Sequence, residues 1–169
     1  MVTASRSRRL AVRPLHALLP AILLLAALAV AGGRGGGAFT LETLAGRTLR
    51  VGEKPRVALL VFGARWCRPC EELVPALRRL AAAHGRRGLE VVMVGLAARE
   101  DETTFSRWAR ETGFEGPLVF DGGRQLERRF EVREVPTLVA VGDGGRVLWR
   151  GEDPPAPETV AGWLAAARP

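Results

Sequence analysis

Both cysteines of this 169-residue chain stand in one short segment, residues 66–70, which reads Trp-Cys-Arg-Pro-Cys. The apolar run Val57–Val61 shortly before it has the length and composition of a buried strand, whereas the residues after Cys70 switch to helical spacing. The pair is therefore predicted to lie at a strand-to-helix turn, with a helix beginning near Cys67. This constraint is strong because one turn must place two thiols within reach of each other.

The position of Cys67 favours a reactive thiolate. Unpaired backbone N–H groups and the positive end of the helix dipole stabilise an anion at a helix start. Arg68 adds a cation in the spacer, and Pro69 suits the first helical turn, where a missing N–H costs little. Cys70 follows one turn later on the same side. We therefore expect Cys67 to attack a substrate disulfide and Cys70 to resolve the mixed disulfide.

Three alternative roles for the cysteines are less favoured. A structural disulfide across so short a loop would remove little entropy from the unfolded chain. A structural zinc ion needs about four ligands, and beyond the two cysteines only His16 and His84 remain. Two unreactive buried thiols would not account for the spacing. No metal and no separate cofactor are therefore predicted, and the redox-active Cys67–Cys70 disulfide is itself the functional group.

The residues around the cysteine pair resemble the signature of a known family. Trp66 and the two cysteines after an apolar strand, with Val-Pro-Thr at 135–137, resemble the active-site signature of the thioredoxin superfamily. The wider pattern is most similar to its extracytoplasmic thiol–disulfide oxidoreductases of the TlpA, ResA and CcmG type. Pro75 and the segments 88–95 and 130–137 match that branch in order, so that the resemblance extends from Phe39 to the C-terminus.

The resemblance implies an α/β, thioredoxin-like fold, with a central mixed β-sheet flanked by helices and an N-terminal β-hairpin extension. The residue patterns agree with this expectation. Alternation of apolar and polar residues over 39–51, around Ala45 and Gly46, predicts the hairpin. Strands are predicted at 89–94, 118–120, 137–141 and 146–149, and helices over 67–84, around 105–112, up to Phe130 and over 158–167.

The resemblance reverses the isomer that is expected for the peptide bond before Pro136. On sequence alone, an X-Pro bond is trans about 95 % of the time. In the resembled superfamily the matching proline is cis and lies against the cysteine pair, and the preceding backbone, here Val135, pairs with an incoming peptide. Trp66, Arg68 and Pro69 are likewise expected to shape the site or to contact the substrate.

Two positions depart from the resembled pattern. Many thioredoxins have a buried aspartate where this chain has Val61, and ResA-type proteins often have a glutamate where it has Leu73. Proton transfer to and from Cys70 therefore lacks its usual acidic partner. Glu72 and Glu134 are the candidate replacements for a proton relay, and water is the third option.

The N-terminal region indicates export. Residues 1–14 carry four arginines and no acid, and residues 15–31 form an apolar stretch interrupted only by His16 and Pro20. Its length is close to the lower limit of about 17 residues for a spanning helix. Residues 1–31 are predicted to be a cleaved signal peptide or, as we favour, a retained membrane anchor, with the following domain on the extracytoplasmic, periplasmic side. Residues 32–37 are a Gly-rich linker, and 38–169 form the thioredoxin-like domain.

The charge of the chain comes mainly from this leader. The net charge is +7, and removing the four leader arginines leaves 21 basic against 18 acidic residues, a balance of +3. No cluster of Lys and Arg interleaved with aromatic residues is present, so nucleic acid is not an expected partner. The expected partners are a protein disulfide substrate, the membrane, and a membrane electron donor of the DsbD or CcdA kind.

The resemblance favours a protein-disulfide reductase that acts in cytochrome c maturation or on another periplasmic disulfide. An oxidant of the DsbA kind would use the same residues, but it usually carries a large helical insertion, and little beyond one helix separates Val94 from Leu118. A metallochaperone could hold Cu(I) on the two thiolates, although no Met/His cluster accompanies them. A peroxidase is less favoured, because the threonine expected shortly before a peroxidatic cysteine is absent.

Overall fold

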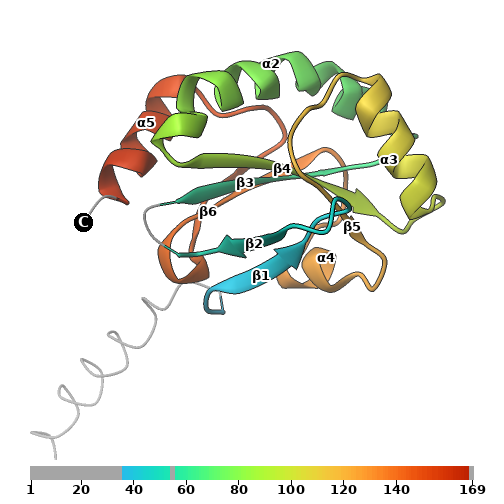
Figure 1. The fold of residues 1–169 in the computed structure, drawn as a ribbon, viewed down its shortest axis with the longest axis horizontal. Helices are drawn as coiled ribbons and strands as arrows, with labels where there is room; N and C mark the ends of the chain where they lie inside the picture. Colours follow the sequence, from blue (N-terminus) through green and yellow to red (C-terminus); the bar gives the residue numbers. More distant parts are fainter. Residues whose placement is uncertain (1–35, 54–55, 168–169) are drawn as a thin grey trace, which may run out of the picture. The chain divides into compact units, whose positions relative to one another are not determined.

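The computed structural model describes residues 36–53 and 56–167. Their centre is a five-stranded mixed sheet in the order β5-β4-β3-β6-β7 (Figure 1). Three of the strands are parallel, and the other two run antiparallel to their neighbours. The parallel strands are β3 (Val57–Gly63), β4 (Leu89–Leu96) and β5 (Leu118–Asp121), and the others are β6 (Thr137–Val141) and β7 (Val147–Gly151).

The predicted hairpin forms a separate two-stranded antiparallel sheet. It consists of β1 (Phe39–Glu42) and β2 (Thr48–Val51). Gly46 in the connecting turn has a φ of +73°, a conformation that glycine adopts without steric cost. The backbone N–H of Leu44 donates to the carbonyl of Leu118 at 2.8 Å, so the hairpin is hydrogen-bonded to the start of β5.

In the described part of the chain, four helices cover the two faces of the central sheet. They are α2 (Arg68–His84), α3 (Glu102–Glu111), α4 (Gln125–Arg129) and α5 (Pro157–Ala166), with 3-10 turns at Gly85–Arg87 and Asp143–Gly145. Figure 1 shows α2, α3 and α5 on one side of the sheet and the hairpin with α4 on the other. The connection from β4 to β5 contains the single helix α3, as predicted.

The central strand β3 shows why both faces are covered. All seven of its residues are buried. Successive side chains of a strand point to opposite faces: Leu59 and Val61 belong to the core beneath α2, α3 and α5, whereas Leu60 and Phe62 belong to the core beneath the hairpin and α4. The near-continuous apolar runs of β3 and β4 follow from this burial on both sides.

Glycine lets α3 approach β4 closely. A Cβ atom at Gly95 would lie 2.5 Å from Cγ of Phe105, which is fully buried on α3. Real Cβ atoms do not come this close to a ring carbon, so a larger residue at Gly95 would push α3 outward. The position of α3 matters because the segment before it contacts the cysteine-bearing turn.

The thioredoxin-like α/β fold and the hairpin extension are confirmed, with small differences in the bounds of the elements. Strand β7 begins at Val147 and continues to Gly151, two residues beyond the predicted end, and α5 begins at Pro157. The predicted leader, 1–31, and most of the linker lie outside the described residues. Within the described ranges, no helix has the length and apolar character needed to cross a membrane.

Candidate active site

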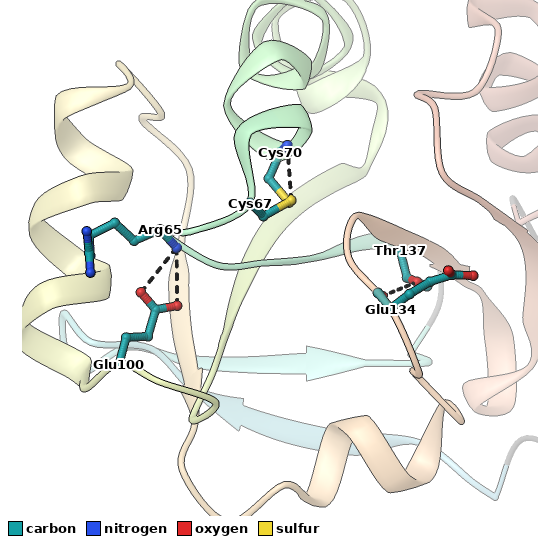
Figure 2. Close-up of a disulfide and its surroundings, with 6 residues drawn as sticks. All are labelled: Arg65, Cys67, Cys70, Glu100, Glu134 and Thr137. Carbon is teal, nitrogen blue, oxygen red and sulfur yellow. Dashed lines mark hydrogen bonds between the residues drawn. A yellow bond between two sulfur atoms is a disulfide. The ribbon is translucent and has the colours of Figure 1, made fainter.

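The two cysteines lie at the start of α2, as predicted. Cys67 is the residue before the helix, and its sulfur accepts a hydrogen bond from the backbone N–H of Cys70 at 3.2 Å (Figure 2). The turn before it is closed by the N–H of Cys67, which donates to the carbonyl of Ala64 at 2.9 Å. Pro69 lies in the first helical turn, where its missing N–H costs no helical hydrogen bond.

Cys67 and Cys70 are joined by a disulfide, with 5.3 Å between their Cα atoms. Cys67 is 4 % exposed and Cys70 is 1 % exposed, and both belong to the apolar core beneath α2. The oxidised pair is thus held by the helix start from one side and by apolar side chains from the other. The attacking role of Cys67 and the resolving role of Cys70 stay predictions.

The end of β3 leaves room for the second sulfur. A Cβ atom at Gly63 would lie 3.5 Å from the sulfur of Cys70 and 3.8 Å from Cη2 of Trp108. Trp108, which is buried on α3, therefore also adjoins the space beside Cys70. Val61 is 1 % exposed in the same apolar core. Its position, where many thioredoxins have aspartate, supplies no proton to this disulfide.

The peptide bond between Val135 and Pro136 is cis, which confirms the predicted isomer. The following residue, Thr137, pairs with Phe62 in the antiparallel register of β6 and β3. The cis bond therefore lies at the end of the sheet at which β3 stops and the chain turns toward Cys67. That Pro136 and Val135 contact a substrate stays a prediction.

Trp66 is the one large apolar side chain that is exposed among the described residues, at 45 %. Its indole N–H donates to the carbonyl of Ala98 at 2.8 Å, and the guanidinium of Arg99 lies 5.8 Å from the ring centroid. A shallow cavity adjoins the tryptophan and is lined by charged residues of the same turn and helix: Arg65, Arg68, Glu71 and Glu72. An exposed aromatic beside the disulfide is a suitable contact surface for a partner protein.

The two predicted proton-relay residues occupy different places. The carboxylate of Glu72 faces Arg68, with 3.5 Å between Oε1 and Nε, and both side chains are largely exposed. The backbone carbonyl of Glu134 accepts a hydrogen bond from the hydroxyl of Thr137 at 2.7 Å. Figure 2 shows the Glu134 carboxylate directed away from the cysteines. Their role in proton transfer stays a prediction.

Glu100 is a site residue that the sequence analysis missed. Both of its carboxylate oxygens accept from the backbone N–H of Arg65, at 3.1 and 3.3 Å (Figure 2). Burial raises the pKa of the Glu100 carboxyl above its ordinary value, whereas the Arg65 backbone N–H opposes this rise. The next residue, Asp101, caps α3 by accepting from the N–H of Thr104 at 2.8 Å, which lowers the Asp101 pKa.

A zinc ion on the cysteines does not fit this geometry. His84 ends α2, and a helix rises about 1.5 Å per residue, so its ring lies about 25 Å from the helix start. Across residues 36–53 and 56–167, no three or more His, Cys, Asp and Glu side chains are grouped as metal ligands would be. His84 therefore lies too far from the two cysteines to share a metal ion with them.

The AhpC/TSA family model matches residues 36–150, which is more than half of the chain. The chain belongs to the AhpC/TSA family. The matched range includes the hairpin, the cysteine pair and the cis-proline segment, so the family assignment and the predicted site cover the same part of this AhpC/TSA-family protein.

Among curated relatives, the thiol–disulfide oxidoreductase ResA of Halalkalibacterium halodurans is 28 % identical over 111 residues. The alignment covers 65 % of this chain and 62 % of that protein, so the chain spans less than two thirds of the length of this relative. Its name agrees with the predicted enzyme class, a thiol–disulfide oxidoreductase, and the resemblance to the ResA type is confirmed.

Solved structures show the same fold. StoA from Bacillus subtilis superposes with a TM-score of 0.64 at 21 % identity, covering 75 % of this chain and 95 % of that one. A thiol:disulfide interchange protein of the DsbE type from Chlorobium tepidum superposes with a TM-score of 0.62 at 26 % identity, covering 79 % and 96 %. These structures match the domain that carries the site.

Proposed function

We propose that this AhpC/TSA-family protein is an extracytoplasmic thiol–disulfide oxidoreductase that reduces disulfides in exported proteins, with apo-cytochrome c as the first candidate substrate. The observation that supports the proposal most strongly is the disulfide at the N-terminus of α2, where the N–H of Cys70 points at the sulfur of Cys67. A backbone donor and the helix dipole together stabilise the thiolate that attacks a disulfide.

In the proposed reaction, the reduced protein begins with a Cys67 thiolate and a Cys70 thiol. The thiolate attacks one sulfur of the substrate disulfide, and the other substrate sulfur leaves as a thiolate and takes up a proton. Cys70 then loses its proton and attacks the sulfur of Cys67, which breaks the mixed disulfide and releases the second substrate thiol. Two electrons pass to the substrate, and the protein ends with the Cys67–Cys70 disulfide.

Each turnover leaves the protein oxidised, so a reductant must restore the dithiol. A membrane electron donor of the DsbD or CcdA kind would supply two electrons by the same exchange chemistry. A retained anchor in residues 1–31 would keep the domain close to such a donor, whereas a cleaved leader would release it. The basic and then apolar composition of that segment supports the export that both versions need.

A disulfide oxidant of the DsbA kind is the main alternative, because the same two cysteines could run the exchange in the other direction. The short connection from β4 to β5, with α3 alone, favours the reductant by resemblance. A Cu(I) carrier would bind metal on the two thiolates without exchanging disulfides. Experiments can therefore distinguish the direction of electron transfer, and can distinguish disulfide exchange from Cu(I) binding.

Trapping of the mixed disulfide tests the proposed reaction. Cys70→Ser leaves the attacking sulfur but removes the resolving one, so this variant is expected to accumulate a covalent adduct with a disulfide-containing substrate such as oxidised apo-cytochrome c. Cys67→Ser, the matched control, is expected to form none, because the remaining Cys70 lies inside α2 and lacks the position before the helix that favours a thiolate. The measurement is a non-reducing gel followed by mass spectrometry. Equal trapping by both variants, or by neither, contradicts the assigned roles.

A further inference from the structure

The segment just before the cysteines is fastened to the segment just before α3. The carboxylate of Glu100 accepts from the backbone N–H of Arg65, and the carbonyl of Ala98 accepts from the indole of Trp66. Arg99, between them, has a φ of +66° and places its guanidinium over the Trp66 ring. Residues 98–100 thus hold residues 65 and 66 of the cysteine-bearing turn in place.

The Glu100 carboxylate is held where its charge is disfavoured. Burial removes it partly from water, and the neighbouring Asp101 carboxylate adds repulsion. The charge and the backbone N–H of Arg65 act in the opposite direction. The other cation of this segment, Arg99, stacks over Trp66. The net result is a pKa above the ordinary value for glutamate, so the carboxyl takes up a proton more readily than an exposed one.

The backbone group that Glu100 binds lies close to the reactive sulfur along the chain. Arg65, whose N–H the carboxylate binds, stands two residues before Cys67. Two residues span at most about 7 Å of chain, and the hydrogen bond from Arg65 to Glu100 adds 3.1 Å, so the carboxylate lies within about 10 Å of the Cys67 backbone, close to the Debye length of about 8 Å at physiological ionic strength. A thiolate formed on Cys67 would therefore repel an ionised Glu100, and partial burial limits the screening of this repulsion by salt.

We propose that Glu100 is a positioning residue of the redox site, which fixes the backbone before Cys67 and couples its own protonation to reduction of the Cys67–Cys70 disulfide. The inference rests on the proposed function and deepens it. Reduction places two electrons on the disulfide and one proton on Cys70, and leaves Cys67 as a thiolate. The new negative charge favours protonation of Glu100, and protonated Glu100 in turn favours the reduced pair, because such coupling is reciprocal.

The test is a redox titration of the full-length, detergent-solubilised protein with dithiothreitol between pH 5 and pH 8, with the reduced fraction measured by thiol alkylation and mass shift. The variants are Glu100→Gln, which removes the charge, and Glu102→Gln as a matched control. Glu102 is exposed in the first turn of α3, so its charge is screened by water.

At pH 8, Glu100→Gln is expected to raise the equilibrium constant for reduction about threefold. The reason is that it removes one negative charge near Cys67, whose repulsion of the thiolate is partly screened by water. The difference from the wild type should shrink as the pH is lowered and Glu100 takes up a proton, and Glu102→Gln should follow the wild type throughout. A purely structural role would give an offset that does not change with pH. Such a constant offset, or curves that coincide at every pH, would overturn the proposal.

A second measurement covers the case in which Glu100→Gln does not fold. In the reduced wild type, the alkylation rate of Cys67 should show two ionisations, one from the thiol and a smaller one from Glu100 at acidic pH. Glu100→Asp, which keeps the carboxyl, should retain both. A single ionisation in both proteins would overturn the coupling. If dithiothreitol cannot reversibly reduce the wild-type disulfide, the proposed function fails, and the inference fails with it.

Discussion

Cys67 is buried, and yet it lies where a thiolate would meet stabilising backbone donors. Its 4 % exposure would disfavour a thiolate, but its place before the first turn of α2 and the N–H of Cys70 at 3.2 Å supply the compensating donors. Cys70 lies inside the first turn of α2 and not before it, and at 1 % exposure it is buried in the same apolar core. This difference between the two sulfurs gives the proposed division into an attacking and a resolving cysteine.

Arg68 provides a test of the electrostatics around Cys67. Its side chain is 90 % exposed and pairs loosely with Glu72, so water screens most of its effect. Arg68→Glu is expected to destabilise the Cys67 thiolate relative to the thiol. Alkylation of reduced Cys67 should then be about twofold to fivefold slower at pH 7. Arg79→Glu, an equally large charge change on the exposed side of α2, is the control and should leave the rate unchanged. A larger effect for Arg79→Glu would contradict a local role of Arg68.

Individual residues differ in how far the sequence alone revealed them. The cysteine pair, Pro69 and the cis bond before Pro136 were predictable, because each belongs to a local motif with a known backbone requirement. The contact of Glu100 with Arg65 was not, since the two residues lie 35 positions apart and a single acidic residue before a helix has many alternative roles. The capping residue Asp101 was the available signal, because Asp before a helical stretch marks an N-terminus and hence the segment beside it.

Helix α2 carries the site, and its buried face holds it on the sheet. Leu77 is fully buried on this face, in the core that also contains both cysteines. Leu77→Ala should lower the free energy of unfolding by about 2–5 kcal/mol, because it removes buried methyl groups and leaves a cavity. Urea denaturation followed by circular dichroism measures the change. Arg79→Ala on the exposed face should stay within about 0.5 kcal/mol of the wild type; an equal loss in both variants would contradict the assigned face.

The N-terminus of α3 gives a prediction with a definite pH dependence. The Thr104 backbone N–H lowers the pKa of Asp101, so the ionised cap stabilises the fold above the pKa that Asp101 has in the unfolded chain. This contribution is lost as the pH falls through the lower folded-state pKa. Asp101→Ala should therefore lower the midpoint of thermal unfolding at pH 7 and come closer to the wild type as the pH is reduced toward about 3. A deficit that does not change with pH would show that the charge of the cap is not responsible.

The elements themselves were largely predictable, because their patterns are simple. The hairpin follows from alternation, β3 and β4 from apolar runs, and α2 from leucines spaced by three or four residues. The ends were less exact: β7 extends to Gly151 because residues 147–151 pair with β6, and its sequence has no apolar alternation to mark that end. Pairing between strands, rather than the local sequence, determines such bounds.

Taken as a whole, the domain brings together segments that are far apart in the chain. Strand β3 ends at the cysteine turn, β6 begins after the cis bond beside it, and the β4–α3 connection binds the turn from a third direction. The order of elements was predictable from the resemblance, but the third contact depends on how α3 packs at Gly95. The site therefore belongs to the folded sheet and its helices together, and not to the motif alone.

The equilibrium reduction potential of the Cys67–Cys70 pair tests the proposed function of the whole protein most directly. It is measured on the full-length, detergent-solubilised protein by titration with glutathione or dithiothreitol redox buffers, and Cys70→Ser serves as the control that cannot form the internal disulfide. A reductant should have a potential near or below about −250 mV, close to that of thioredoxin. A value near about −120 mV would make the protein a disulfide oxidant and would contradict the proposed direction of electron flow.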